Sequence, residues 1–238
     1  TIILGVDGDT DLTVASTTGT GMGSTSAVTN STGSTLDVSA TAIVFTTQPA
    51  TSVSGSALGT QPVVTARDAF GNTDTDFTET ITVTEASAGT LSNTLVAASS
   101  GVATFTNLTY AATADQQSFT LTANDQDGVG TNLSTVDANA VTSDVVATQL
   151  VFNTQPAPLN VNSASASAFT TVPVVSARDD NNIVDTGYST GITLAEVNGA
   201  GSATMSATGD TDGSAATVTL TPSSGSSTYT SMQITYTA

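Results

Sequence analysis

The sequence predicts an all-β protein built from two similar two-sheet sandwiches in tandem. Thr, Ser, Val, Gly and Ala dominate the composition, strong helix formers are scarce, and no segment keeps an apolar period of 3.6 residues. Asp, which favours turns, far outnumbers Glu, which favours helices. Short alternating segments punctuated by Gly, Asn, Asp and Pro are typical of such sandwiches.

An internal repeat divides the chain. The stretch VVTARD at residues 63–68 recurs as VVSARD at 174–179, and VFTTQPA at 44–50 recurs as VFNTQPA at 151–157. A period of about 110 residues suits a whole small domain rather than a solenoid repeat. We therefore expect an N-terminal strand and linker segment at 1–41, a first domain at 42–146 and a second domain at 147–238.

Each copy holds five segments with strand-like alternation. In residues 119–123 the apolar side chains alternate with threonines, as a half-buried strand requires. The pattern ITYTA at 234–238 matches FTLTA at 119–123, so we expect the second copy to end in register with that strand. The expected strands are 42–47, 62–67, 77–84, 101–106 and 118–123 in the first copy, and 149–154, 171–178, 191–195, 216–221 and 232–237 in the second.

The N-terminal segment does not form a third full copy. DLTVAS at residues 11–16 resembles FTLTAN at 119–124, and STLD at 34–37 resembles STVD at 134–137. The segment therefore resembles the end of a preceding repeat. Either a longer array was cut, or the subunit carries a surplus strand at its N-terminus.

Residues 1–6 (TIILGV) are nearly continuously apolar, which suits a strand buried on both faces. Two interpretations stay open. Residues 1–16, or some part of them, insert into a neighbouring subunit's sandwich and link subunits head to tail into a filament, or the run is the first strand of the adjacent domain in the same chain. The apolar residues of the expected inter-subunit strand are Ile2, Ile3, Leu4 and Val6.

The charge balance argues against several classes of partner and of activity. The net charge is −18 with only two basic residues, so nothing neutralises phosphate, and neither nucleic acid nor membrane insertion is expected. Because the chain lacks His, Cys and Lys, it has no ordinary base for a Ser nucleophile, no thiolate and no Schiff-base lysine. We expect no enzyme. The absence of Cys and the scarcity of trypsin sites fit a secreted, extracellular protein.

Two acidic loops are candidate Ca²⁺ sites. Alternate carboxylates in a tight turn converge on one ion, and the first loop has the D-x-D-x-D spacing of many calcium loops. Thr18 stands where an EF-hand carries its closing Glu. The competing interpretation is ordinary solvated turns, where Asp is common. The candidate ligands are Asp7, Asp9 and Asp11 in the first loop and Asn124, Asp125 and Asp127 in the second.

The only cationic side chains, Arg67 and Arg178, occupy the same place in the two copies. An arginine at an identical position in two domains is expected to hold a strand end to a turn through a bidentate ion pair, in preference to a role as a ligand-binding cation. The candidate partners are Asp68, Asp74, Asp76 or Glu85 for Arg67, and Asp179, Asp185 or Glu196 for Arg178.

Three stretches carry a family resemblance: PVVTARDAFGN at 62–72, SGVATFTNLTY at 100–110, and the VFxTQP openings at Val44 and Val151. They resemble the bacterial immunoglobulin-like repeats of large surface adhesins and invasin-type proteins, over about residues 42–238. The resemblance implies immunoglobulin-like sandwiches that act as spacers or stalks outside the cell. The second copy departs from the pattern, with Asp180-Asn181-Asn182 where the first has Phe70-Gly71-Asn72.

We therefore expect an extracellular structural protein, a subunit of a surface stalk or filament that self-associates into a polymer. The alternative is an adhesin module whose loops bind a glycan or a receptor on a host or other cell surface, and a third hypothesis is an accessory domain of a hydrolase. A binding module should show a loop rich in aromatic residues. The candidates for such a loop are Phe70, Tyr229 and Tyr236.

Overall fold

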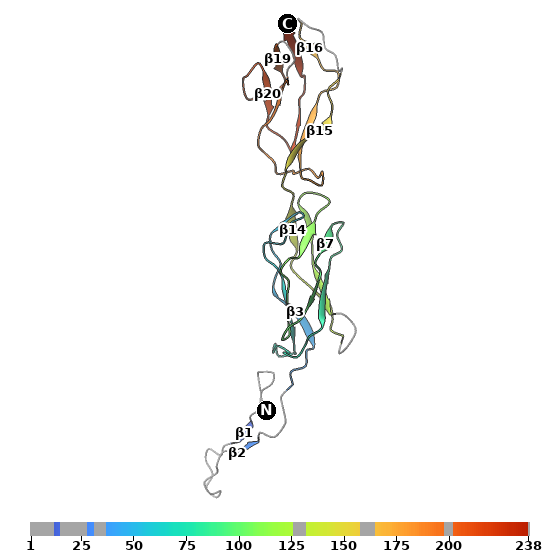
Figure 1. Ribbon diagram of the computed structural model, residues 1–238, viewed down its shortest axis with the longest axis vertical. Coiled ribbons are helices and arrows are strands. Elements are labelled where there is room, and N and C mark those ends of the chain that lie inside the picture. The colour runs from blue at the N-terminus through green and yellow to red at the C-terminus, as the bar shows by residue number, and fades with distance from the viewer. Residues whose placement is uncertain are drawn as a thin grey trace.

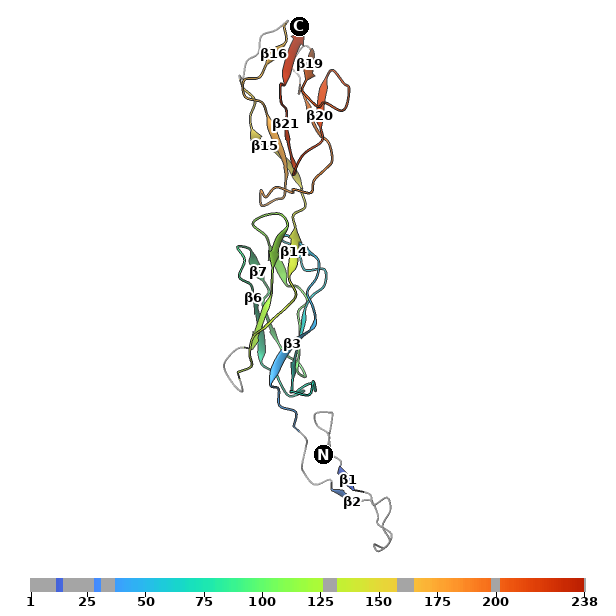
Figure 2. The ribbon, with the colours of Figure 1, turned by 180° about the vertical axis from the view of Figure 1, so that it is seen from behind.

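The computed structural model describes residues 12–14, 28–30, 37–125, 132–157, 165–197 and 202–237. Every regular element in these ranges is a strand, so the predicted all-β class is confirmed. Consequently the described part of the chain holds no helix that could cross a membrane. The strands form two bundles placed end to end in an elongated molecule, seen from opposite sides in Figures 1 and 2.

We call residues 37–145 the first unit and residues 146–237 the second unit, because none of the described strand pairings crosses between them. β1 (Leu12–Val14) and β2 (Val28–Asn30) pair with each other, and lie beyond the end of the first unit that faces away from the second (Figure 1). The first unit contains β3 (Ala42–Thr47), β4 (Ser52–Val53), β5 (Val63–Arg67), β6 (Thr80–Thr84), β7 (Thr90–Ser92), β8 (Leu95–Ala97), β9 (Val102–Thr104), β10 (Thr109–Ala111), β11 (Gln117–Phe119), β12 (Thr122–Asp125), β13 (Val136–Asp137) and β14 (Val141–Asp144). The second unit contains β15 (Gln149–Thr154), β16 (Ser167–Ala168), β17 (Val174–Arg178), β18 (Ile192–Ala195), β19 (Ser202–Ser206), β20 (Thr217–Leu220), β21 (Ser226–Thr228) and β22 (Gln233–Thr237).

Both units are sandwich-like and share part of their sheet order. The sheets of the first unit are β3-β5-β9, β13-β12-β6-β8, β11-β14-β4 and β10-β7. Those of the second unit are β15-β17-β21, β18-β20 and β16-β22-β19. The opening strands β3 and β15 carry the same irregularity in register, at Phe45/Thr47 and at Phe152/Thr154.

The core of the first unit lies between its sheets, because strand alternation turns every second side chain inward. Ile81 and Val83 on β6 are both buried, and the aromatic ring of Tyr110 stacks on Phe119 with ring centroids 3.9 Å apart. The Tyr110 hydroxyl is within hydrogen-bond distance of the Ser87 hydroxyl, at 2.6 Å. The buried phenol therefore keeps a polar partner.

The single strand expected at residues 118–123 is two strands in different sheets. β11 pairs with β14, the chain then changes sheet at Thr120 and Leu121, and β12 pairs with β6. Phe119, Leu121 and Ala123 are nevertheless all buried. The alternation in the sequence is therefore real, but it does not reveal a change of sheet, since both sheets face the same core.

A tight hairpin turn recurs in both units. Ser100 and Gly101 have φ values of 50° and 77°, and Ser224 and Gly225 have 47° and 71°. Two successive residues with positive φ form a type I′ turn, which matches the twist of the flanking strands. The hydrogen bonds Val102 N–H to Ser99 O and Ser226 N–H to Ser223 O close the two turns.

Starting from this turn, backbone hydrogen bonds show which residues of the two units correspond. Phe105 N–H donates to Pro62 O in the first unit, and Tyr229 N–H donates to Pro173 O in the second. A few residues later, Leu58 N–H donates to Leu108 O and Phe169 N–H donates to Met232 O. β22 is therefore the counterpart of β10.

The expected register of residues 234–238 with 119–123 is wrong. The matching alternation misled the alignment, because several segments of this Thr-rich chain alternate apolar residues with Thr. The described residues of the second unit hold no counterpart of β11, β12, β13 or β14. Its core is correspondingly smaller than that of the first unit, built around Val175, Ile192, Met205, Val218, Leu220, Tyr229 and Met232.

Tyr229 provides a test of this second core. Its side chain is fully buried, its hydroxyl donates to Ile192 O at 2.7 Å, and burial raises its pKa to about 12 from 10.0. The unfolded chain ionises at the ordinary value, so the contribution of Tyr229 to stability is present below pH 10 and is lost as pH rises through 12. We expect Tyr229→Phe to lower the free energy of unfolding by about 1 kcal/mol at neutral pH. In urea titrations the gap between parent and variant should close at alkaline pH; a gap independent of pH would contradict the burial.

Candidate functional site at the junction of the two units

Two aspartates at equivalent positions hold the chain where it enters each unit. Asp74 is buried, and its Oδ2 accepts the N–H of Ala40 at 2.8 Å. In the second unit, Asp185 Oδ2 accepts the N–H of Ala147 at 3.0 Å. A carboxylate that accepts a backbone N–H forms a charge-assisted hydrogen bond, stronger than a neutral one. Both entering segments are therefore fixed to the body of the unit that follows.

The same aspartates also bind their own loops. Asp74 Oδ1 accepts the N–H of Phe77, and Asp185 Oδ1 accepts the N–H of Gly187, both at 3.0 Å. Each carboxylate thus uses both oxygens, one on the entering segment and one on the loop. Such short-range Asp-to-amide bonds are the reason Asp is favoured in turns.

A third aspartate connects the two units directly. Asp115 lies in the loop before β11, and its Oδ1 accepts the N–H of Val145 at 2.7 Å. Its Oδ2 accepts both the N–H of Thr186, at 2.9 Å, and the Thr186 hydroxyl. Thr186 directly follows Asp185 in the loop of the second unit. One carboxylate of the first unit therefore bonds both the last residue of that unit and the second unit.

Hydrophobic burial supports these bonds. Val145, at the end of the first unit, is fully buried, and Val38 at the equivalent position before the first unit is buried as well. The backbone bonds Thr41 N–H to Arg67 O and Thr148 N–H to Arg178 O are both 2.8 Å long. Linker residues are usually exposed and mobile. Here they are hydrogen-bonded in the same way before each of the two units, and each segment buries one valine.

The junction carboxylate is held in its charged form. Desolvation acts to raise the pKa of Asp115, but the hydrogen bonds donated by Thr186, Val145 and Gln116 together outweigh it and lower the pKa below the ordinary 3.8. Because its pKa is depressed in the folded state, the contribution of Asp115 to stability is complete above the pKa of the unfolded chain. That contribution is lost as pH falls through the folded-state pKa.

We therefore expect the junction to loosen in acid. Above pH 3.8 the Asp115 bonds persist, and protonation at its folded pKa, which lies below that value, removes the charge that accepts the bonds from Val145 and Thr186. Small-angle scattering should show a constant maximum dimension at neutral pH and a broader distribution of dimensions once the carboxylate is protonated. Asp115→Asn keeps the shape but has no charge to lose, so its scattering should not change in the same pH step.

The arginines lie beside turns in which the neighbouring aspartates bind backbone amides. Asp68 accepts the N–H groups of Phe70 and Asn72, and hydrogen bonds from Asn72 lower its pKa. Asp179 accepts the N–H of Ile183 at 2.8 Å. The bonds described for the Arg178 guanidinium go to two amide oxygens, Asn182 O and Asn153 Oδ1.

The ion pairs expected from the sequence, among Arg67, Asp68 and Glu85 and among Arg178, Asp179 and Glu196, stay predictions. Glu85 accepts the N–H of Ser87, and Glu196 accepts the N–H of Ala203 at 3.2 Å. The Nε atoms of both arginines are buried without a hydrogen-bond partner.

Most of the expected calcium ligands and the whole inter-subunit strand lie outside the described residues. These are Asp7, Asp9, Asp11, Asp127, Ile2, Ile3, Leu4 and Val6. Asn124 and Asp125 belong to β12, where Asp125 is buried and its Oδ2 accepts the N–H of Leu133 at 2.9 Å. Within the described ranges, no three acidic side chains gather closely enough to hold a metal ion. The calcium hypothesis stays a prediction.

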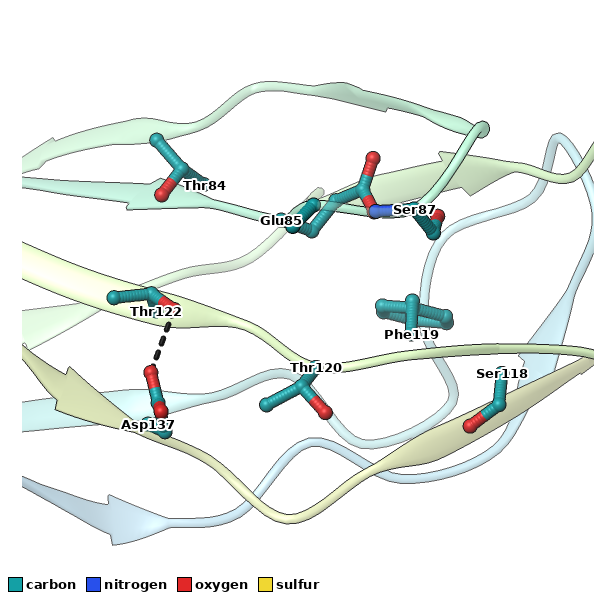
Figure 3. Close-up of a pocket in the computed structure, with 9 residues that line it drawn as sticks. Thr84, Glu85, Ser87, Ser118, Phe119, Thr120, Thr122 and Asp137 are labelled. Carbon is teal, nitrogen blue, oxygen red and sulfur yellow. Dashed lines mark hydrogen bonds between the residues drawn. The ribbon is translucent and has the colours of Figure 1, made fainter.

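A shallow hollow of about 430 Å³ opens where β11 passes into β12 (Figure 3). Its two acidic residues are Glu85 and Asp137, and each already accepts a hydrogen bond, from Ser87 N–H and from the Thr122 hydroxyl. Phe119 lies between Glu85 and Ser87 on one side of the hollow and Thr120 on the other (Figure 3). A hollow lined by hydroxyls, one aromatic ring and two occupied carboxylates offers weak polar contacts and no nucleophile paired with a base.

Sequence reasoning missed the role of Asp115 and Thr186, which lie far apart in the chain. It did single out Asp74 and Asp185 as acids kept by the repeat, but as arginine partners. The signal that could have found the junction is the repeated pair of Asp-Thr dipeptides at 74–75 and 185–186. No protein-family model, curated protein or solved structure matches the chain.

Proposed function

We propose that this chain is an extracellular structural protein, a spacer in a surface stalk or filament made of tandem immunoglobulin-like domains. The observation that carries the proposal is the repeated anchoring of the segment that leads into each unit, with Asp74 on Ala40 and Asp185 on Ala147. A spacer must hold its domains at a fixed separation. A linker anchored by carboxylates does this, whereas a free Gly/Ser linker would behave as a flexible coil.

The Asp115 bond to Thr186 strengthens this interpretation. Relative motion between domains of one chain is the default unless their interface is large and hydrophobic, so a fixed junction here needs specific bonds. Here the bond joins the same loop that anchors the linker, so a bend between the units would break several hydrogen bonds together. The net charge of −18 favours solubility, and the two basic residues leave trypsin only two sites.

The test is electron microscopy of the purified chain at increasing concentration. A spacer that assembles is expected to appear as extended particles of uniform length that join end to end. Compact or randomly bent particles would contradict the proposal. Asp115→Ala is the matched variant, and it should give bent particles while the circular dichroism spectrum stays that of a β protein.

One observation favours the alternative function, an adhesin module. Phe70 is 84% exposed at the tip of the turn after β5. Because Gly71 N–H donates to Asp68 O as Asn182 N–H donates to Asp179 O, the equivalent of Phe70 in the second unit is Asn181 and not Asp180, which corrects the alignment made from the sequence. An exposed aromatic ring on one loop can stack on a sugar ring. Binding on a glycan array that disappears in Phe70→Ala would support a binding role; a lack of binding by the parent would leave the spacer as the sole proposal.

A further inference from the structure

A hollow of about 420 Å³ opens on the side of the second unit, beside β20 and β21. Among the described residues that line it, Leu220 supplies the apolar side chain and Gly209 leaves one wall without a side chain. Every other lining residue is a Ser or a Thr, and none is charged. We call this the hydroxyl hollow. It presents hydroxyl groups, and no charge, to a ligand.

One wall of the hydroxyl hollow comes from a connection that is longer in the second unit than in the first. β19 pairs with β22 as β7 pairs with β10, and β20 pairs with β18 as β8 pairs with β6. Residues 207–216 between β19 and β20 therefore take the place of residues 93–94 between β7 and β8. Thr208, Gly209 and Thr211 of this connection line the hollow, and the connection projects beside β20 in Figure 2. Binding residues are often carried by loops on a rigid scaffold.

The connection is held against β20 by its own hydrogen bonds. Thr211 N–H donates to Thr219 O, and Asp210 Oδ1 accepts the N–H of Thr219, both at 3.0 Å. Asp212 Oδ2 accepts the hydroxyls of Thr217 and Thr219, at 2.8 and 2.7 Å. Both carboxylates thus serve to order the connection. A wall that is ordered before a ligand arrives reduces the entropy that binding costs.

A buried hydroxyl of the hollow has no hydrogen-bond partner. Ser227 lines the hollow and is 2% exposed, and its Oγ makes no hydrogen bond to the described protein. It pairs with Val175 where Ala103 pairs with Val64 in the first unit, so its side chain turns toward the space between the sheets. An unpaired buried hydroxyl costs free energy of folding, which the alanine of the first unit avoids. Ser227 therefore marks a position where a ligand can supply the missing bond.

The corresponding surface of the first unit lacks these hydroxyls. Ala97 stands where the second unit has Thr221, and Val102 stands where it has Ser226. Ala97 and Thr104 are exposed, so β11–β14 leave this side of the first unit uncovered. The hydroxyl hollow is therefore a property of the second unit itself and does not depend on strands equivalent to β11–β14.

We propose that the hydroxyl hollow binds a neutral sugar residue. Each Ser or Thr hydroxyl both donates and accepts hydrogen bonds, as the hydroxyls of a sugar do. The net charge of −18 disfavours an anionic ligand, and the lining offers no carboxylate to a cation. Leu220 provides an apolar surface for the C–H groups of a sugar ring. The inference goes beyond the spacer function, because it assigns a ligand to the second unit, at a place separate from Phe70 of the first.

The binding is expected to be weak, with a dissociation constant on the order of 1 mM. Each neutral hydrogen bond contributes little net free energy in water, and none of the described lining residues is aromatic. Many copies of a weak site on one filament bind a surface far more tightly than one copy does. A weak site is thus compatible with the proposed structural role.

Nuclear magnetic resonance of the full chain tests the proposal, with the methyl glycosides of glucose, galactose, mannose and N-acetylglucosamine as probes. At least one glycoside should shift the amide signals of Thr208, Thr211 and Ser227. Ser227→Ala introduces the residue of the first unit, and it should raise the thermal transition of the second unit while weakening the binding about tenfold. Thr204→Ala, which changes an exposed threonine of β19 outside the hollow, should alter neither property. A variant that merely folds poorly would lower the thermal transition.

Glycerol is the control for a general effect of hydroxyl compounds. Equal shifts with glycerol, undiminished binding in Ser227→Ala, or no shift with any of the four glycosides at concentrations well above the expected dissociation constant would overturn the proposal. Phe70→Ala should leave the shifts unchanged, which separates this site from the exposed ring of the first unit. The spacer function is measured by the rigidity of the junction between the units, so each proposal can fail without the other.

Discussion

Gly225→Ala is expected to destabilise the second unit by roughly 2–4 kcal/mol, because two penalties combine at this position. Gly225 has φ of 71°, a conformation that L side chains rarely adopt. A Cβ added there would also collide with the carbonyl group of Asp185, the residue whose side chain anchors Ala147. The variant should therefore lower the thermal transition of the second unit and loosen the segment that leads into it.

The chain contains a matched control for each penalty. Gly213 has φ of 65° but no atom near an added Cβ, so Gly213→Ala should cost only about 1 kcal/mol. Gly101 in the first unit stands at the position of Gly225 and would collide with the carbonyl of Asp74, so Gly101→Ala should destabilise the first unit similarly. Calorimetry of the three glycine variants measures the loss of stability in each. Equal effects at Gly225 and Gly213 would show that the close approach to Asp185 is not a constraint.

Asp74→Ala is expected to cost roughly 2–4 kcal/mol, since it leaves two backbone donors without an acceptor. Asp74 is buried, and both Ala40 N–H and Phe77 N–H bond to it. Ala40 is itself buried, so water cannot readily replace the lost bond. Asp74→Asn keeps one acceptor oxygen and should cost less than half as much. Urea unfolding of the three proteins gives the comparison, and an Asp74→Ala variant as stable as the parent would contradict the anchoring role.

Much of this fold could be predicted from sequence because its strands obey simple alternation. The segments expected at 42–47 and 149–154 coincide with β3 and β15, and the VVTARD and VVSARD stretches contain β5 and β17. The alternation of apolar residues and threonines gave a wrong alignment where several segments share it. Residues 234–238 alternate like 119–123, but hydrogen bonds from the Ser-Gly turn onward make β22 the counterpart of β10.

The candidate site was less predictable. Asp74 and Asp185 could be recognised as repeated acids, yet nothing local distinguishes a carboxylate that pairs with arginine from one that binds a backbone amide. The bond between Asp115 and Thr186 depends on how two loops distant in the sequence meet. Only the three-dimensional arrangement brings these two loops together, because each loop by itself is an ordinary polar turn.

The internal repeat allows a comparison that neither unit gives alone. An exposed Leu150 or Phe152 would be unremarked in isolation, since single exposed apolar residues are common. Leu150 is half-exposed, whereas Ile43 at the matching position of the first unit is buried. The first unit thus serves as an internal reference for the second.

The most direct test of the spacer function is the distance between equivalent points on the two units. Thr78 and Ser189 are exposed and occupy equivalent positions, and the chain has no native cysteine to interfere. Spin labels attached to Thr78→Cys and Ser189→Cys report this distance by double electron–electron resonance. A rigid junction predicts one narrow distance distribution, which broadens when Asp115→Ala is added. A broad distribution in the chain with Asp115 intact would contradict a rigid spacer.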